Sequence, residues 1–249
     1  MFRNERELLI MDKVCGIVNE VLLRLSEMVK PGVSTLFLDK KAYEFCREYN
    51  AEPAFLGYSN YPATLCISIN DEVVHGIPRE DKVLKEGDIV SLDFGALKDG
   101  FYGDAAITLG VGKINYASQR LIETTKDCLK EAIKHCRVGN KLGMISSTIQ
   151  KIAEKEGYSV IRDYVGHGIG TKLHEPPPVP NYGNEEEGPF LEEGMVLAIE
   201  PMVCEGGYEV EVDEDGWTVR TKDGKNSAHF ECCVAITKEG PKILGSNII

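Results

Sequence analysis

Two aspartates flank a turn signal at a spacing that could bring both carboxylates to the same metal ions. Asp93 and Asp104 lie on either side of Asp99-Gly100, between two runs of apolar residues. Asp-Gly favours a two-residue hairpin, because both turn residues need positive φ angles. In that register Asp93 faces Ala106, and Asp104 lies one diagonal step away on the same sheet face, about 7 to 8 Å off. Such carboxylates can share metal ions about 3.5 to 4 Å apart, whereas a three-residue turn would separate them and leave a solvated turn face.

Two glutamates interrupt stretches that are otherwise apolar. Glu200 follows Val196-Leu197-Ala198-Ile199, and Glu231 precedes Cys232-Cys233-Val234-Ala235-Ile236. An unpaired carboxylate in a buried strand is costly, so each glutamate needs a cation. A buried Lys or Arg could neutralise either one, but the basic residues lie mostly outside these stretches. The two glutamates and two aspartates together therefore favour a divalent metal.

Histidines next to glycines could complete a metal site. His167 lies within Gly-His-Gly-Ile-Gly, His174 follows seven residues later, and His75 begins a second His-Gly-Ile sequence. Glycines allow the backbone to approach a site closely. Four carboxylates and one imidazole form a mixed oxygen and nitrogen set, which suits Mn, Fe, Co or Zn in a site unlike the all-thiolate set of a structural zinc. His229 shares a strand face with Glu231 at i+2 and could reach the site on spacing alone.

Apolar periodicity predicts the elements that must position these residues. Residues at a 3.6-residue period indicate amphipathic helices, and stretches rich in Val, Ile and aromatics indicate strands. A proline-rich segment at 176–180 and an acidic one at 185–188 predict an extended surface loop. The predicted helices span 5–29, 35–49, 115–137 and 141–157, and the predicted strands span 63–70, 88–97, 101–109, 195–204 and 229–237.

The chain also resembles itself at an offset of 107 residues. Residues 84–93 align with 191–200, so that Asp93 falls on Glu200, and Gly32 falls on Gly139. Coincidence among similar turn sequences is the alternative explanation. A true repeat predicts two pseudo-symmetric halves, about 1–112 and 113–249, within a single domain of residues 1–249, with a site between the halves.

Composition narrows the classes of function. The 249 residues carry 28 Lys and Arg against 40 Asp and Glu, a net charge of -12 that disfavours nucleic acid as a partner. No apolar run approaches the roughly 20 residues that span a bilayer, and no secretion signal opens the chain, so we expect a cytoplasmic protein with no membrane partner. The eight cysteines show no metal-binding or disulfide pattern and should be reduced thiols. Fingerprints of serine hydrolases, Walker-type nucleotidases and dinucleotide-binding proteins are lacking.

Six short motifs, taken together, resemble the type I methionine aminopeptidases over essentially the whole chain. The resemblance implies an α+β pita-bread fold, in which two pseudo-symmetric halves surround a central antiparallel sheet with a dinuclear metal site. The motifs are Val74-His75-Gly76-Ile77-Pro78, Ser91-Leu92-Asp93-Phe94-Gly95, Tyr102-Gly103-Asp104-Ala105, Gly166-His167-Gly168-Ile169-Gly170, Ala198-Ile199-Glu200-Pro201-Met202 and Ser227-Ala228-His229-Phe230-Glu231.

The family resemblance also implies the roles of the metal-site residues. Asp93 should chelate one metal, Asp104 and Glu231 should bridge both, and His167 with Glu200 should complete the other. The cofactor implied is two divalent ions per chain, Co²⁺, Mn²⁺, Fe²⁺ or Zn²⁺. The resemblance also implies that His229 is not a metal ligand.

A catalytic mechanism follows from this resemblance. A hydroxide bridging the two metals would attack the first peptide bond, and a metal would hold the free α-amine of the substrate. Glu200 would relay the proton of the attacking water. His75 and His174 match the two family histidines that contact substrate, and they would stabilise charge that develops at the peptide bond.

Specificity for methionine requires an apolar pocket, and the family's pocket positions are occupied here by aromatic and sulfur-containing side chains. Leu173 stands where relatives often carry Phe, which suggests a looser wall. Cys232 replaces a His found in many relatives, which we expect to alter the surroundings of the metal. The pocket positions are Phe55, Tyr58, Tyr61, Cys66 and Trp217.

The expected function is removal of the initiator methionine from nascent proteins when the second residue is small. The enzyme would act as a monomer with transient ribosome association. One alternative is an Xaa-Pro aminopeptidase or prolidase, which normally carries an additional N-terminal domain. Another is a non-catalytic pita-bread protein that binds peptides, although such relatives lose metal ligands that this chain keeps.

Overall fold

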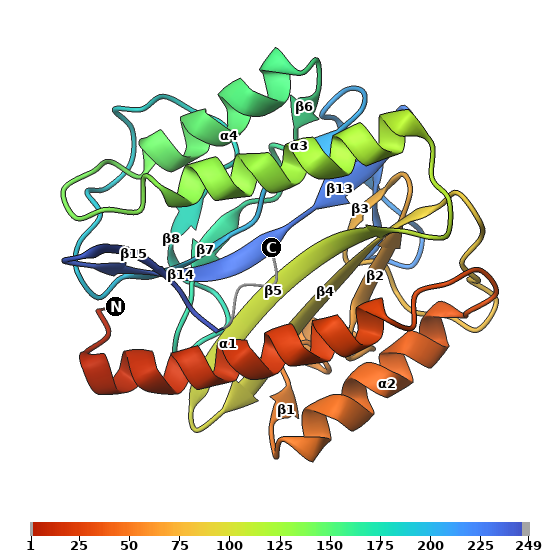
Figure 1. The fold of residues 1–249 in the computed structure, drawn as a ribbon, viewed down its shortest axis with the longest axis horizontal. Helices are drawn as coiled ribbons and strands as arrows, with labels where there is room; N and C mark the ends of the chain where they lie inside the picture. The colour runs from red at the N-terminus through yellow and green to blue at the C-terminus, as the bar shows by residue number, and fades with distance from the viewer. Residues whose placement is uncertain (1, 246–249) are drawn as a thin grey trace.

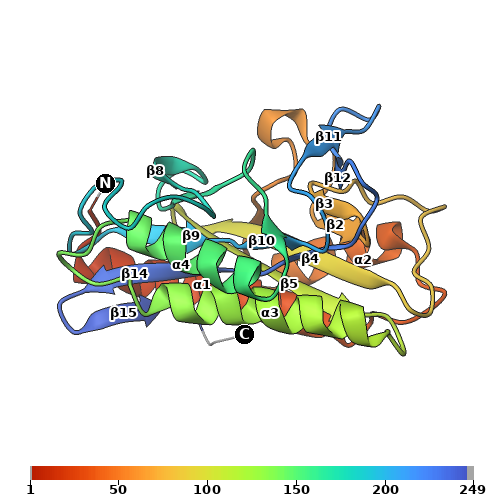
Figure 2. The same cartoon turned by 90° about the horizontal axis from the view of Figure 1, so that it is seen from above.

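An antiparallel sheet with helices on one face forms the frame of the molecule (Figures 1 and 2). The structure is a computed structural model that describes residues 2–245. The main sheet has nine strands, and β2 and β15 extend it by pairing with β4 and β14. In sheet order the strands are β1 (Glu52–Pro53), β4 (Ile89–Lys98), β5 (Phe101–Gly110), β14 (Glu231–Thr237), β9 (Val196–Ile199), β7 (Gly166–Gly168) and β8 (Glu175–Val179), with β2 (Cys66–Ile69) and β15 (Gly240–Ile243) beside them.

Two three-stranded sheets accompany the main one. The first sheet consists of β13 (Ser227–His229), β10 (Met202–Cys204) and β6 (Ser159–Val160), and the second of β11 (Val210–Val212), β12 (Val219–Thr221) and β3 (Glu72–Val74). The second sheet and the short 3₁₀ turn η1 (Tyr58–Asn60) stand on the side away from the helices (Figure 2).

Four amphipathic helices confirm the prediction from periodicity, with ends that differ by a few residues. A polar side chain caps three of the helices: Asn4, Ser34 and Asn115 each accept a hydrogen bond from a first-turn backbone amide. In Figure 1, α1 and α2 form one pair and α3 and α4 another, both in front of the sheet. The helices are α1 (Glu5–Ser26), α2 (Thr35–Glu48), α3 (Tyr116–Ile133) and α4 (Gly143–Lys155).

The hairpin between β4 and β5 has the predicted register. Lys98 pairs with Phe101, so the loop contains only Asp99 and Gly100, whose φ angles are 51° and 80°. Both angles lie in the left-handed region that a type I′ turn requires. The two-residue turn fixes which residues of the two strands face each other.

The strand predicted at 195–204 is wrong, because it breaks near its middle into β9 and β10, which are separated at Glu200-Pro201. The strand predicted at 229–237 corresponds to β14, except that His229 ends β13 and the chain breaks at Phe230 between the two strands. Pro201 lacks the backbone N–H that would continue the ladder, and its carbonyl accepts from Phe230 N at 3.3 Å. Both segments thus pass together between the main sheet and the sheet of β6, β10 and β13.

The predicted surface loop at 176–180 is also wrong, because these residues lie almost wholly within β8. β8 pairs only with β7 in the main sheet and forms its edge. Prolines are tolerated in an edge strand, where one side of the backbone has no ladder partner to lose. Residues 185–188 do lie in a loop, as expected.

The 107-residue offset recurs in the backbone contacts. Gly32 N donates to Leu84 O at 2.8 Å, and Gly139 N donates to Leu191 O at 2.9 Å. Both glycines have positive φ, at 90° and 87°. Equivalent turns therefore tie the helices of each half to the segment that precedes its acid-bearing strand.

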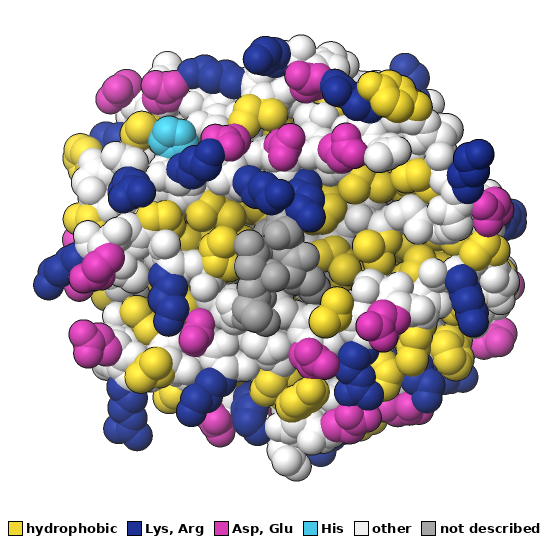
Figure 3. All heavy atoms as spheres, viewed as in Figure 1, with side chains coloured by type: hydrophobic (Ala, Val, Ile, Leu, Met, Phe, Trp, Pro, Cys, Tyr) yellow, Lys and Arg dark blue, Asp and Glu magenta, His cyan; other side chains and the backbone are white. Residues whose placement is uncertain are grey.

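The surface carries charge of both signs. On the helix-bearing face, acidic and basic side chains of the described residues are interspersed (Figure 3). None of the helices within residues 2–245 combines the length and hydropathy needed to cross a bilayer. All eight cysteines are free and buried.

Candidate metal centre and active site

Strand register brings three of the predicted carboxylates to one sheet face. Asp93 on β4 faces Ala106 on β5, and Ala106 in turn faces Glu231 on β14. Asp104 precedes Ala106 by two residues, so its side chain points to the same face. The small side chain of Ala106 leaves room for the carboxylates around it. All three acids are thus placed together by the hairpin and by the pairing of β5 with β14.

A second row of the sheet positions the predicted histidine and the fourth carboxylate. His167 on β7 faces Ala198 on β9, and Ala198 faces Cys233 on β14. Glu200 follows Ala198 by two residues at the point where β9 ends. Alternation therefore turns both His167 and Glu200 toward the same face as the aspartates.

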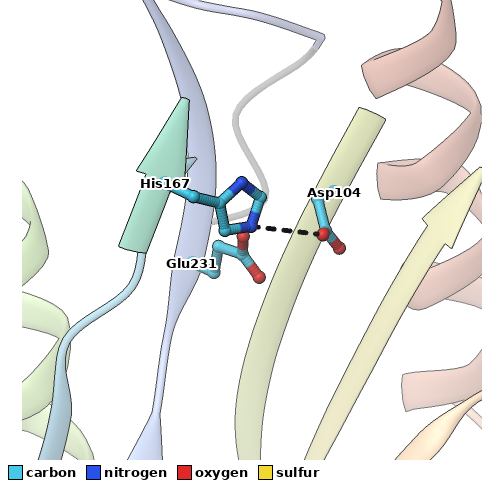
Figure 4. Close-up of side chains that lie close together, drawn as sticks. All are labelled: Asp104, His167 and Glu231. Atoms are coloured by element: carbon cyan, nitrogen blue, oxygen red, sulfur yellow. Dashed lines mark ion pairs between the residues drawn. The ribbon is translucent and has the colours of Figure 1, made fainter. Parts of the chain in front are cut away.

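The side chains converge in the centre of the sheet. Figure 4 shows Asp104, His167 and Glu231 pointing toward one another from β5, β7 and β14. One ligand atom from each lies within 4.8 Å of the others, a grouping that could hold a metal ion. His167 Nε2 lies 3.9 Å from Asp104 Oδ2 and 3.8 Å from Glu200 Oε1, while His229 Nε2 lies 3.5 Å from Glu200 Oε2.

Burial makes four negative charges at this place costly. Loss of hydration, together with the neighbouring carboxylates, raises the pKa of Asp93, Glu200 and Glu231 well above the usual carboxyl value. Burial also raises the pKa of Asp104, to about 7, although the amide of Ala105 donates to its carboxylate and opposes the shift. Without a cation the cluster favours protonated carboxyls, so the site is built for positive charge.

The imidazoles near the cluster are neutral at physiological pH. Burial lowers the pKa of His167 and His75 to about 4, and the nearby imidazole of His174 contributes to both shifts. Burial also lowers the pKa of His174 and takes that of His229 to about 3. A neutral imidazole has a free lone pair, which is what a metal requires of a histidine ligand.

The residues present fit a bound divalent ion. One oxygen each of Asp93, Asp104 and Glu231 is buried without a hydrogen-bond partner, as is Nε2 of His229. Such groups normally have hydrogen-bond partners, so buried oxygens that lack them and lie close together fit a bound cation. Oxygen donors with one imidazole suit a catalytic transition metal.

A cavity of about 240 Å³ opens directly onto this cluster. All five predicted metal ligands, both predicted substrate histidines and all the predicted pocket positions line it. The lining comprises Phe55, Tyr58, Ser59, Tyr61, Cys66, Val74, His75, Asp93, Asp104, Tyr164, Val165, His167, Leu173, His174, Glu200, Trp217 and Glu231.

The two predicted substrate histidines are held by aromatic side chains. Tyr58 Oη lies 2.6 Å from His174 Nδ1, and the His174 ring centroid lies 4.3 Å from that of His167. The His75 ring makes edge contacts with Tyr164 at 5.4 Å and with Trp217 at 6.1 Å. Both imidazoles line the cavity beside the carboxylate cluster.

Sequence reasoning missed Tyr164, which lies in neither a predicted strand nor a quoted motif. Its one signal was its position three residues before the glycine-flanked His167. The expectation for Cys232 also needs correction, because its side chain packs in the helix-side core. Cys233, its neighbour, is the one that faces the metal side, where its thiol donates to Asp104 O at 3.3 Å. Strand alternation makes this unavoidable once Glu231 faces the cluster.

Comparison with known proteins agrees with this geometry. The model of metallopeptidase family M24 matches residues 10–238. The chain belongs to metallopeptidase family M24. The M24 fold is the pita-bread fold, so the predicted fold class is confirmed, and Asp104, His167 and Glu231 form a cluster that could hold the metal of a metallopeptidase.

Individual M24 proteins resemble the chain over nearly its full length. The methionine aminopeptidase of Clostridium acetobutylicum is 48% identical over 98% of this chain and 98% of its own. The crystal structure of a methionine aminopeptidase from Thermotoga maritima superposes with a TM-score of 0.97 at 44% identity, covering 99% of this chain and 100% of that one. A prolidase from Pyrococcus horikoshii superposes less well, with a TM-score of 0.80 at 25% identity, and this chain spans 63% of it.

Proposed function

We propose that this M24 peptidase removes the N-terminal methionine of nascent proteins when the second residue is small. One observation carries the proposal: the cavity that opens onto the acid and histidine cluster is walled by aromatic and sulfur-containing side chains. Such a wall suits the flexible thioether of methionine. The likeness to methionine aminopeptidases along nearly the whole chain supports the same activity.

The proposed cofactor is a pair of divalent ions, Co²⁺, Mn²⁺, Fe²⁺ or Zn²⁺. Asp93, Asp104, His167, Glu200 and Glu231 would hold them. When bound, the ions supply Lewis-acid activation of water and of the scissile carbonyl, and a contact for the free amine of the substrate. Buried oxygens without hydrogen-bond partners support this assignment.

Glu200 is proposed to move the proton. Its carboxylate lines the cavity beside the cluster, where it can accept a proton from water that is activated there. The same carboxyl can then deliver the proton to the amine that leaves when the peptide bond breaks. Its position after β9, where the chain leaves the main sheet, lets it face the cavity and the cluster together.

His174 is proposed to stabilise the negative charge that develops on the peptide oxygen. A Tyr58 hydroxyl that donates to Nδ1 leaves the proton of the neutral imidazole on Nε2, where it can be donated to substrate. The lowered pKa of His174 keeps this ring neutral. His75 offers a second imidazole in the cavity, in edge contact with Tyr164 and Trp217.

The apolar end of the cavity is proposed to receive the methionine side chain. Tyr61 and Trp217 meet edge to face with ring centroids 5.1 Å apart, and Cys66 lies beside Asp93 in the sheet register. Phe55, Tyr58 and the buried Leu173 complete the wall. Stable aromatic packing of this kind holds a pocket open at a fixed width.

The proposed substrates determine the expected partners. Nascent chains are met where they are synthesised, so the proposal includes cytoplasmic action and transient association with the ribosome. The enzyme is proposed to work as a monomer.

The two alternatives receive less support. The chain is 48% identical to a methionine aminopeptidase but 25% identical to the prolidase that shares the fold, of which it spans 63%. A non-catalytic peptide binder would have no use for four buried carboxylates whose charge repulsion costs stability in the absence of a cation.

The test is release of methionine from two peptides, Met-Ala-Ser and Met-Lys-Ser. Protein stripped of metal is assayed with Mn²⁺, Fe²⁺, Co²⁺ or Zn²⁺ added back. Glu200→Gln removes the proposed proton carrier, and Glu193→Gln, on the exposed loop before β9, is the matched control.

We expect metal-dependent cleavage of Met-Ala-Ser alone, lost in Glu200→Gln and kept in Glu193→Gln. Folded, metal-loaded protein that releases no methionine from either peptide would refute the proposal and leave peptide binding as the better explanation. Cleavage of an Xaa-Pro dipeptide in preference to both would favour the prolidase alternative.

A further inference from the structure

The side chain of Arg3 is buried beneath the loop that carries His174. Its side chain is 1% exposed, although it precedes the first helix, and it forms an ion pair with Glu175, whose side chain is 8% exposed. The guanidinium also lies 5.9 Å from the ring centre of Phe101. Glu175 is the first residue of β8, so the ion pair joins the segment before α1 to the edge strand of the main sheet. Burying an arginine costs several kcal/mol unless it is paired, so the contact with Glu175 must be specific.

Two glycines make room for this buried arginine. A Cβ on Gly170 would lie 1.7 Å from Arg3 Nη2, and a Cβ on Gly194 would lie 2.7 Å from Arg3 O. Arg3 N donates to Gly194 O at 2.7 Å, which fixes the backbone from which the side chain extends. The guanidinium therefore occupies a space shaped for it, between the loop after β7 and the turn before β9.

Glu175 connects Arg3 to both ends of the His174 loop. Its Oε1 accepts from Thr171 N at 2.9 Å and from Lys172 N at 3.1 Å, while its Oε2 pairs with Arg3. Burial alone would raise the pKa of this carboxyl, but the Lys172 amide and Arg3 lower it, so the carboxylate is charged at neutral pH. The Arg3 contact therefore anchors a closed loop whose interior residues include His174.

The position of His174 depends on this loop. Its ring centroid lies 4.3 Å from that of His167, and its Nδ1 lies 2.6 Å from the hydroxyl of Tyr58. Tyr58 is 40% exposed and belongs to a short 3₁₀ turn, so it is a weak anchor by itself. The buried ion pair below the loop supplies the rigid side of the arrangement.

We propose that Arg3 is a positioning residue for His174. Through Glu175 it fixes the position of the loop of residues 169–175, and the loop in turn directs the imidazole toward the acid and histidine cluster. The inference rests on the proposed function, because His174 is assigned there to the reacting peptide bond. A loop released from below lets the imidazole move by a fraction of an ångström or more, and such displacements are enough to slow a reaction about a hundredfold.

The experiment uses full-length protein loaded with Mn²⁺ and the peptide Met-Ala-Ser. Arg3→Gln removes the charge, Arg3→Lys keeps it, and Arg6→Gln changes an exposed arginine three residues further along. Arg3→Gln is also combined with His174→Ala. We expect Arg3→Gln to lower kcat about ten- to one-hundredfold with little change in KM, Arg3→Lys to retain most of the activity, and Arg6→Gln to match the unaltered protein.

The double variant separates positioning from general damage. If Arg3 acts through His174, then Arg3→Gln has no further effect on kcat once His174→Ala is present. An equal fold-loss in both backgrounds would overturn the proposal. The NMR signals of the His174 ring in metal-free protein give a readout without catalysis, and these should shift in Arg3→Gln but not in Arg6→Gln.

Two further outcomes are distinguishable. An Arg3→Gln protein with unchanged kcat and unchanged His174 signals would also overturn the proposal. Failure of the unaltered protein to release methionine would instead refute the proposed function, and the NMR comparison would still report whether Arg3 fixes the His174 loop. If Arg3→Gln does not fold, Glu175→Gln tests the same contact from the other side.

Discussion

The metal-free protein should lose stability as the pH rises above neutrality. Asp93, Glu200 and Glu231 have pKa values well above the usual carboxyl value because they are buried beside one another, and the pKa of Asp104 is about 7. In the unfolded chain all four would ionise near pH 4. The folded state therefore binds protons that the unfolded chain has already released.

The sign of the effect follows from this difference. When the folded state binds more protons, raising the pH lowers the free energy of unfolding until the folded carboxyls themselves ionise. Buried histidines act in the opposite sense, because burial lowers the pKa of His167 to about 4 and that of His229 to about 3. The histidines change the free energy of unfolding only up to about pH 6.5. Above that pH, the change in the free energy of unfolding comes from the carboxyls.

The magnitude can be estimated for the range from about pH 6.5 to 8.5. A carboxyl that stays protonated in the folded state costs about 1.4 kcal/mol per pH unit, or about 3 kcal/mol over the range. Asp104, with a pKa of about 7, adds about 1 kcal/mol. One such carboxyl and Asp104 together therefore predict a loss of at least about 4 kcal/mol, from a total of about 5 to 15 kcal/mol.

The assay is urea unfolding of EDTA-treated protein at both pH values. Glu231→Gln should shrink the loss by up to about 1.4 kcal/mol per pH unit, whereas Glu239→Gln, exposed just beyond the same strand, should leave it unchanged. Saturating Mn²⁺ should abolish the loss. Equal stability of the metal-free protein at both pH values would refute the reasoning, and so would a loss that Glu231→Gln does not reduce.

Three further substitutions test single contacts. Tyr58→Phe removes the 2.6 Å contact to His174 Nδ1 and should lower kcat for Met-Ala-Ser about tenfold, while stability changes by less than about 0.5 kcal/mol; an unchanged kcat would show that the hydroxyl does not orient the ring. Gly95→Ala would place a Cβ 2.7 Å from Phe55 Cε1, so the ring must move and KM for the peptide should rise about tenfold in steady-state kinetics. A variant KM equal to that of the unaltered protein would show that Phe55 does not form the pocket wall. Gly100→Ala in the hairpin turn, where φ is 80°, should cost about 1 to 2 kcal/mol in urea unfolding with kcat and KM preserved, and no loss of stability would contradict the turn assignment.

Much of the site could be predicted because local rules determine it. Asp99-Gly100 specifies a two-residue turn, and that turn alone sets the strand register that brings Asp93 and Asp104 to one face of the sheet. The apolar surroundings of Glu200 and Glu231 indicate burial, and burial of a charge implies a cation. These inferences need no knowledge of how distant segments pack.

Features set by tertiary packing escaped prediction. The break at Glu200-Pro201 coincides with a break at Phe230, and only the pairing of the two strands explains why both leave the sheet together. Arg3 looks like an exposed terminal residue in sequence, and its burial depends on Gly170 and Gly194 from distant turns. Contacts between segments so far apart leave no periodic signal in either one.

The central claim is that a divalent metal held by the acid and histidine cluster enables methionine release. The most direct measurement follows release from Met-Ala-Ser while Mn²⁺ is titrated into metal-free protein, with bound metal per chain determined on the same samples. We expect no release without metal, and release that rises with occupancy up to two ions per chain and disappears in Asp104→Asn. Release by the metal-free protein, or full occupancy without release, would contradict the account.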